Sequence, residues 1–78
     1  MKVLFFAQLR QVTGLAEAEL AAEDVDVAGL WEALLLRWPK LTEQRSQIRL
    51  AKNGVYATDG ERFLAGDEVA LIPPVSGG

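Results

Sequence analysis

The chain has 78 residues, of which 50% are hydrophobic, 24% are charged and none is Cys or His. This length allows one compact domain, and the apolar content is that of a folded protein rather than a disordered one. The absence of Cys and His excludes thiolate nucleophiles, imidazole bases, disulfide bonds and nearly all zinc or iron–sulfur sites, and the net charge of −3 argues against a nucleic-acid ligand.

Residues 2–10 form the first predicted element, an apolar run rich in aromatic and branched side chains. Such residues favour a buried strand. Val3 and Phe5 would point to one face of the sheet, and Leu4 and Phe6 would point to the other. A sheet covered by a helix on one side would therefore keep an apolar stripe on its other side, which needs another cover.

Residues 17–21 alternate polar and apolar side chains after a loop at Thr13-Gly14, so we expect a second strand that pairs with the first. The main helix comes next, with Asp26 as its N-terminal cap and Pro39 at its end. Its apolar residues recur at the spacing of one helix face, which indicates core packing on the sheet. These residues are Val27, Leu30, Trp31, Leu34, Leu35 and Trp38.

The segment that follows the helix, residues 41–47, is polar and weakly patterned, so we expect a connection with a short helical turn. Residues 48–52 alternate again and end at Asn53-Gly54, a pair typical of turns with positive φ. A short strand over residues 55–58 fits between this turn and a second one at Asp59-Gly60, for which the same conformation is predicted.

The last strand, residues 68–72, follows a turn at residues 64–67 and ends at Pro73-Pro74. The predicted order is ββαβ(β)β, in which a mixed sheet packs on one main helix and buries the apolar faces. This is the α+β arrangement of the β-grasp, or ubiquitin-like, fold, whose first and last strands lie parallel at the centre of the sheet. We expect one β-grasp domain over residues 1–74 and a flexible C-terminal Gly-Gly tail over residues 75–78.

The charges are separated along the chain. Every charged residue between Arg10 and Arg37 is acidic, whereas residues 37–52 contain five basic residues and Glu43 as the one acid. Such separation can steer a charged partner to one side of a protein. The alternative is that both segments are simply solvated.

The tail is too short and too rich in glycine to fold by itself. An extended segment from Pro74 onward reaches about 17 Å, far enough to enter a narrow channel in another protein. Gly77 and Gly78 would let the channel walls close on the backbone, and the prolines would lower the entropy lost on insertion. A frayed end is the alternative, but the chain offers no other nucleophile or base.

Three segments resemble a known family, the small, sulfur-carrier subunits of molybdopterin synthase, and the resemblance extends over the whole chain. The first is Phe-Phe-Ala-Gln-Leu-Arg at residues 5–10, and the second is Leu-Ala-Gly-Asp-Glu-Val-Ala at residues 64–70. The third, Ile-Pro-Pro-Val-Ser-Gly-Gly at residues 72–78, is the most specific.

The resemblance implies that the carboxylate of Gly78 is the working group. In such proteins a partner enzyme that uses ATP and Mg adenylates this carboxylate, and a sulfur donor then converts it to a thiocarboxylate. The sulfur is delivered to cyclic pyranopterin monophosphate in the large subunit, which builds the dithiolene of molybdopterin. The chain itself would bind no cofactor and no metal and would be inactive alone.

The resemblance also implies a surface that contacts the large subunit. It includes an outward-facing residue of the first strand and the residues that lead to Gly78. These residues are Phe6, Ile72, Pro73, Pro74, Val75, Ser76 and Gly77.

Three other functions share these features. A sulfur carrier for thiamine biosynthesis or tRNA thiolation would use Gly78 in the same way with another acceptor. A ubiquitin-like modifier would end with Gly78 in an isopeptide bond to a lysine. A structural interaction module would be indifferent to the loss of Gly78.

Two features of the sequence indicate a cytoplasmic protein. Lys2 is followed by only five apolar residues before Gln8, which is too short for a signal peptide. The longest apolar runs are also far shorter than the roughly 20 residues of a membrane span. We therefore expect no membrane association.

Overall fold

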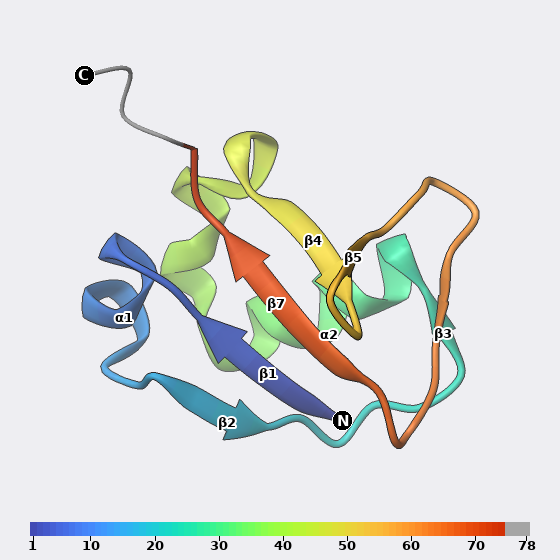
Figure 1. Cartoon of the computed structure of the whole chain (residues 1–78). Coiled ribbons are helices and arrows are strands. Elements are labelled where there is room, and N and C mark those ends of the chain that lie inside the picture. Colours follow the sequence, from blue (N-terminus) through green and yellow to red (C-terminus); the bar gives the residue numbers. More distant parts are fainter. Residues whose placement is uncertain (75–78) are drawn as a thin grey trace.

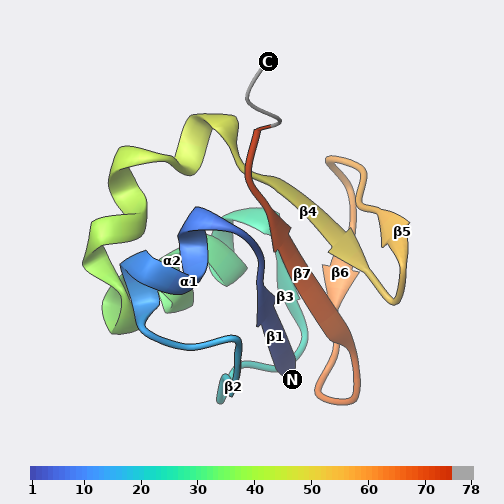
Figure 2. The same ribbon diagram turned by 60° about the vertical axis from the view of Figure 1, so that its left-hand side comes forward.

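The computed structural model of the chain describes residues 1–74. They form a five-stranded mixed sheet with helices on one side and a separate two-stranded sheet, as Figures 1 and 2 show. The order of strands in the main sheet is β2-β1-β7-β4-β5. These strands are β1 (Lys2–Phe5), β2 (Glu17–Glu19), β4 (Arg49–Lys52), β5 (Val55–Tyr56) and β7 (Glu68–Ile72), and the small sheet pairs β3 (Val25–Asp26) with β6 (Arg62–Phe63).

The first and last strands lie side by side and parallel at the centre of the main sheet, in register from Lys2 opposite Glu68 to Phe5 opposite Leu71. β2 and β4 flank this pair in antiparallel orientation, on the β1 side and the β7 side. This topology confirms the predicted β-grasp arrangement. It also places the first and last strands of the sequence beside each other in one sheet.

The main helix is α2 (Val27–Arg37), and its start and end follow the predicted signals. The Asp26 side chain accepts a hydrogen bond of 2.8 Å from the backbone N–H of Gly29, which satisfies a free donor of the first turn. Pro39 begins the 3₁₀ helix η1 (Pro39–Glu43), and η2 (Arg45–Gln47) follows. The expected connection is therefore helical over most of its length.

The core lies between α2 and the inner face of the sheet. Phe5 and Leu71 are buried at the centre of the paired strands, and the ring of Trp38 meets that of Phe5 edge to face at 4.9 Å. Each fully buried large side chain contributes about 1.5–3 kcal/mol. The described core comprises Met1, Val3, Phe5, Leu9, Leu20, Leu30, Trp31, Leu34, Leu41, Ile48, Leu50, Phe63, Val69 and Leu71.

The prediction that the first strand runs to Arg10 is wrong. β1 ends at Phe5, and the short helix α1 (Gln8–Thr13) follows. Ala7 turns the chain with φ 50 and ψ −128, and the N–H of Leu9 donates to the Phe6 carbonyl at 3.0 Å. This turn lets Leu9 return to the core, where it is fully buried, so burial overrides the strand preference of the run.

The two predicted turns with positive φ differ. Asn53 and Gly54 have φ values of 51 and 86 and join β4 to β5, which confirms the first turn. Asp59-Gly60 also forms a turn, in which the N–H of Glu61 donates to the Thr58 carbonyl at 3.1 Å. Neither of its residues has positive φ, so the predicted conformation of the second turn is wrong.

Candidate functional site

The candidate site begins where β7 ends. Ile72, the last residue of that strand, is half-buried, Pro73 is buried and Pro74 is exposed. Because Pro73 is buried, the direction in which the chain leaves the sheet is fixed. The Pro73 side chain is therefore less accessible to a partner than the predicted contact requires. The predicted site residues Val75, Ser76, Gly77 and Gly78 lie outside the described residues.

Phe6 belongs to the same end of the sheet. Phe5 and Leu71 are the last register pair of the parallel strands, so Ile72 is the next residue on β7 and Phe6 is the residue that follows the end of β1. Phe6 is 39% exposed, so its ring is available at the surface. The structure therefore brings together Phe6 and Ile72, two of the residues predicted to contact a partner.

The outer face of the sheet, opposite the helices, continues this surface. Residues that pair across strands share a face, and one row runs through Leu4, Ala70, Ala51 and Tyr56. In the same way Ile72 pairs with Arg49. The helices α1 and α2 lie on the other side of the sheet (Figure 2), so the described residues place no helix over this stripe. The apolar stripe predicted from the first strand is confirmed.

Sequence reasoning missed the edge of this surface. Tyr56 is exposed on β5, and the guanidinium carbon of Arg49 lies 3.9 Å from the centre of its ring. Figure 1 shows β5 at the edge of the sheet, beyond β4. No sequence pattern marks Tyr56, because both residues of β5 are exposed, and its place on this face follows only from its pairing with Ala51.

Most ion pairs, and the side chains whose pKa values are shifted, lie away from Phe6 and Ile72, near the starts of β1 and β7 and in the adjoining loops. Asp67 accepts hydrogen bonds from the backbone N–H of Leu64 at 2.7 Å and from Asn53 Nδ2 at 3.0 Å. These bonds, the first above all, hold the pKa of Asp67 below its usual value, and Lys52 adds to the effect. The hydrogen bond and charge of Glu17 raise the pKa of Lys2, and those of Asp24 raise the pKa of Arg62. These pairs join loops to strands and do not assemble an acid–base pair at the site.

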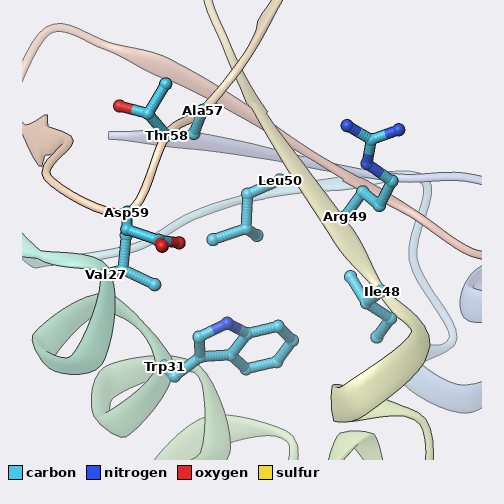
Figure 3. A pocket seen from close by; sticks show the side chains of 8 residues that line it. All are labelled: Val27, Trp31, Ile48, Arg49, Leu50, Ala57, Thr58 and Asp59. Atoms are coloured by element: carbon cyan, nitrogen blue, oxygen red, sulfur yellow. The ribbon is translucent and has the colours of Figure 1, made fainter.

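A pocket of about 190 Å³ opens between α2, the start of β4 and residues 57–59. Figure 3 shows the Trp31 indole on its floor, with Asp59 and Arg49 at its rim. A second hollow of about 370 Å³ lies beside Met1 and residues 19–23. None of the predicted site residues lines either pocket, so neither belongs to the candidate site.

The described residues around Phe6 and Ile72 form a partly exposed, apolar surface. Within residues 1–74 there is no cluster of acidic residues that could hold a metal ion, and no helix is long and apolar enough to cross a membrane. The row of Leu4, Ala70, Ala51 and Tyr56 crosses the middle of the sheet, and Ile72 lies two residues beyond Ala70, where the chain leaves β7. Such a surface can bind another protein and aim the following residues at it.

Comparisons with known proteins match the chain over its full length. A family model described as the ThiS family matches residues 3–78. The molybdopterin synthase sulfur carrier subunit of Homo sapiens is 34% identical, over 100% of this chain and 93% of the human protein. The protein of that name from Arabidopsis thaliana is 39% identical, over 100% of this chain and 82% of the plant protein.

A solved structure agrees with the fold. SAMP1 from Haloferax volcanii, small archaeal modifier protein 1, is similar with a TM-score of 0.83 at 36% identity. The match covers 100% of this chain and 98% of the archaeal one. The described surface at the ends of β1 and β7 therefore lies within a shared fold.

Proposed function

Because the chain belongs to the ThiS family, we propose that it is the sulfur-carrier subunit of a molybdopterin synthase. The observation that carries this function is the full-length similarity to human and plant proteins of that name. The β-grasp fold and the contact surface around Phe6 and Ile72 support it.

Gly78 is the residue that carries the sulfur in this proposal. Its carboxylate attacks the α-phosphorus of ATP on an adenylating enzyme, which releases pyrophosphate and leaves an acyl-adenylate. Sulfur that a donor protein delivers at the oxidation level of sulfide then attacks the acyl carbon and displaces AMP, which leaves a thiocarboxylate in place of the carboxylate. The thiocarboxylate is a nucleophile at neutral pH and needs no cysteine on the carrier, in agreement with a sequence that has none.

Sulfur transfer takes place in the large subunit. The sulfur of the thiocarboxylate replaces an oxygen substituent at a carbon of cyclic pyranopterin monophosphate, so that a C–S bond forms as a C–O bond breaks. Water then cleaves the bond between that sulfur and the Gly78 carbonyl carbon. The carrier regains its carboxylate, and the acceptor keeps the sulfur. Since the dithiolene holds two sulfur atoms, two loaded carriers are needed for each molybdopterin.

The large subunit supplies the groups that this chain lacks. The chain has no His and no Cys, and its described residues form no acid–base pair at the site. ATP and Mg act on the adenylating enzyme, and this chain binds neither as a cofactor. Phe6, Ile72 and Pro74 form the described part of the contact with the large subunit, and Val75, Ser76 and Gly77 extend it along the channel.

The experiment that tests this function is a reconstitution. The chain, its adenylating enzyme, ATP, a sulfur donor and the large subunit are incubated with cyclic pyranopterin monophosphate, and molybdopterin is measured. We expect formation of molybdopterin with the native chain and none after deletion of Gly78, while thermal unfolding of the two chains agrees. Molybdopterin formation by the shortened chain would contradict the proposal.

A modifier function is the second candidate, because the similar archaeal structure is named a modifier protein. In that function the activated Gly78 would acylate a lysine ε-amine and form an isopeptide bond. Mass spectrometry of lysates that contain the tagged chain separates the two functions. Lysine conjugates would support the modifier, whereas a free thiocarboxylate without conjugates would support the carrier.

A further inference from the structure

Two arginines flank the end of β7. Arg49 is opposite Ile72 in the β4–β7 register, on one side of the strand. On the other side, Arg10 Nε donates a hydrogen bond of 3.1 Å to the carbonyl of Phe5, and Phe5 is opposite Leu71. The two guanidinium groups are therefore anchored to the strands on either side of the point where the chain leaves the sheet.

Among the acidic groups of residues 1–74, neither arginine has a partner. The ion pairs found within residues 1–74 occupy the N-terminal ammonium group, Lys2, Lys52 and Arg62, and none of them includes Arg10 or Arg49. Asp59 lines the same pocket as Arg49 without pairing with it. Arg49 is instead held over Tyr56, and Arg10 by a backbone carbonyl, so both charges are preorganised without being neutralised.

The charged side chains near the start of β7 differ in sign from those near its end. At the start of β1 and β7, Glu19 and Glu68 lie on either side of Lys2. β7 is five residues long, which corresponds to about 13 Å between its first and last residues. Although the chain is acidic overall, the end of the sheet around Ile72 is therefore positively charged. The acidic and basic residues that are separated along the sequence also lie at different ends of the folded sheet.

We propose that Arg10 and Arg49, the arginine pair, dock on carboxylates at the rim of the channel that receives the C-terminal segment in the large subunit. This inference rests on the proposed function and adds the chemistry of the partner's surface. The pair would bring the end of β7 toward the channel before the apolar contacts form.

The spacing of the pair favours a protein surface over a phosphate group of the substrate. Neighbouring strands are about 4.8 Å apart, so the strands that anchor the two groups, β1 and β4, are about 10 Å apart. A channel opening with several carboxylates matches two cations anchored on strands this far apart better than a single phosphate does. Carboxylates placed around a channel opening can contact both groups, and each arginine can bind a carboxylate through two N–H donors.

The test measures association with the substrate-free large subunit at two ionic strengths. We expect Arg10→Glu and Arg49→Glu each to slow association on the order of tenfold at low salt, and the difference to shrink at high salt. Lys2→Glu is the control for net charge, since it makes the same change of charge on an exposed residue at the other end of β1, where it also removes the ion pair with Glu17. We expect it to change the rate less than about twofold.

Conservative variants separate charge from packing. Arg49→Lys keeps the charge and gives up part of the contact with Tyr56, so it should associate at nearly the native rate. Arg49→Gln should fall between native and Arg49→Glu. Circular dichroism before each measurement establishes that the variants fold.

The outcomes are distinct. If the native chain does not bind the large subunit, the proposed function fails. If the native chain binds and the glutamate variants slow no more than Lys2→Glu, the arginine pair is wrong while the function stands. A third outcome is that the glutamate variants associate with the substrate-free large subunit at the native rate but bind more weakly than the native chain when substrate is present. That outcome would overturn the assignment to carboxylates, because the arginine pair would then contact the substrate.

Discussion

Phe6 owes its exposure to the backbone of the residue that follows it. Alternation along the first strand predicted correctly that Phe6 does not join Val3 and Phe5 in the core. The turn at Ala7 was not predictable, because φ 50 is uncommon for a residue with a Cβ and alanine carries no signal for it. That turn lifts the chain away from the sheet and leaves Phe6 at its edge.

A charge at Phe6 tests whether this side chain contacts the large subunit. We expect Phe6→Asp to weaken binding at least tenfold, or about 1.4 kcal/mol, because an unpaired carboxylate would be buried in an apolar contact. Isothermal titration calorimetry measures the change. Since Phe6 is 39% exposed in the free chain, its replacement should leave the fold intact.

Leu36 provides the control for this change. It is 80% exposed on α2, on the helix side of the sheet, and has no place in the proposed contact. Leu36→Asp should bind as the native chain does. Equal affinities for all three proteins would remove Phe6 from the contact surface.

At the scale of elements, the strength of the periodic signal decided what the sequence could predict. α2 shows three turns of one apolar face with a cap at Asp26 and a proline after it, and these signals agree with the structure. α1 has six residues, and its apolar face reduces to Leu9 and Val12. Such a short pattern cannot be distinguished from a strand that continues.

The small sheet of β3 and β6 could not be predicted from the sequence for a different reason. Each strand has two residues, too few for any alternation. Their pairing depends on tertiary contacts: Phe63, which is fully buried, lies opposite Val25, and the exposed Arg62 guanidinium binds the Asp24 carboxylate at 2.8 Å. Asp24 has φ 52, which a sequence pattern does not reveal.

Asp67 connects the turn before β7 to the β4–β5 turn, and its charge should appear in the pH dependence of stability. Its pKa is lowered in the folded chain, so its contribution is present above its ordinary value of 3.8 and is lost as the pH falls through the lower, folded value. We expect Asp67→Ala to lower the unfolding midpoint in urea at neutral pH and to flatten the decline below about pH 4.

Asp59→Ala is the comparison for this measurement, because Asp59 is exposed in a neighbouring turn. It should retain the native decline in acid. The role of Asp67 is refuted if its alanine variant and the native chain lose stability in parallel as the pH falls.

At the scale of the whole molecule, the fold and the family followed from the sequence, whereas the shape of the site did not. The parallel pairing of β1 and β7 follows from their apolar character, since central strands of such a sheet are buried. The clustering of Arg10 and Arg49 around Ile72 depends on register, and register is a property of the folded sheet. Charge counts along the chain indicated a basic segment, but Arg10 lies outside it.

The central claim is that Gly78 carries the sulfur, and its most direct test is the intact mass of the chain. The native chain is incubated with the adenylating enzyme, ATP and a sulfur donor, beside one chain without Gly78 and one with a residue added after it. Deletion withdraws the carbonyl by about 3.5 Å, and misplacement of about 1 Å can already cost a hundredfold in rate. We predict a mass gain of one oxygen-to-sulfur exchange in the native chain alone; the same gain in the shortened chain would contradict the account.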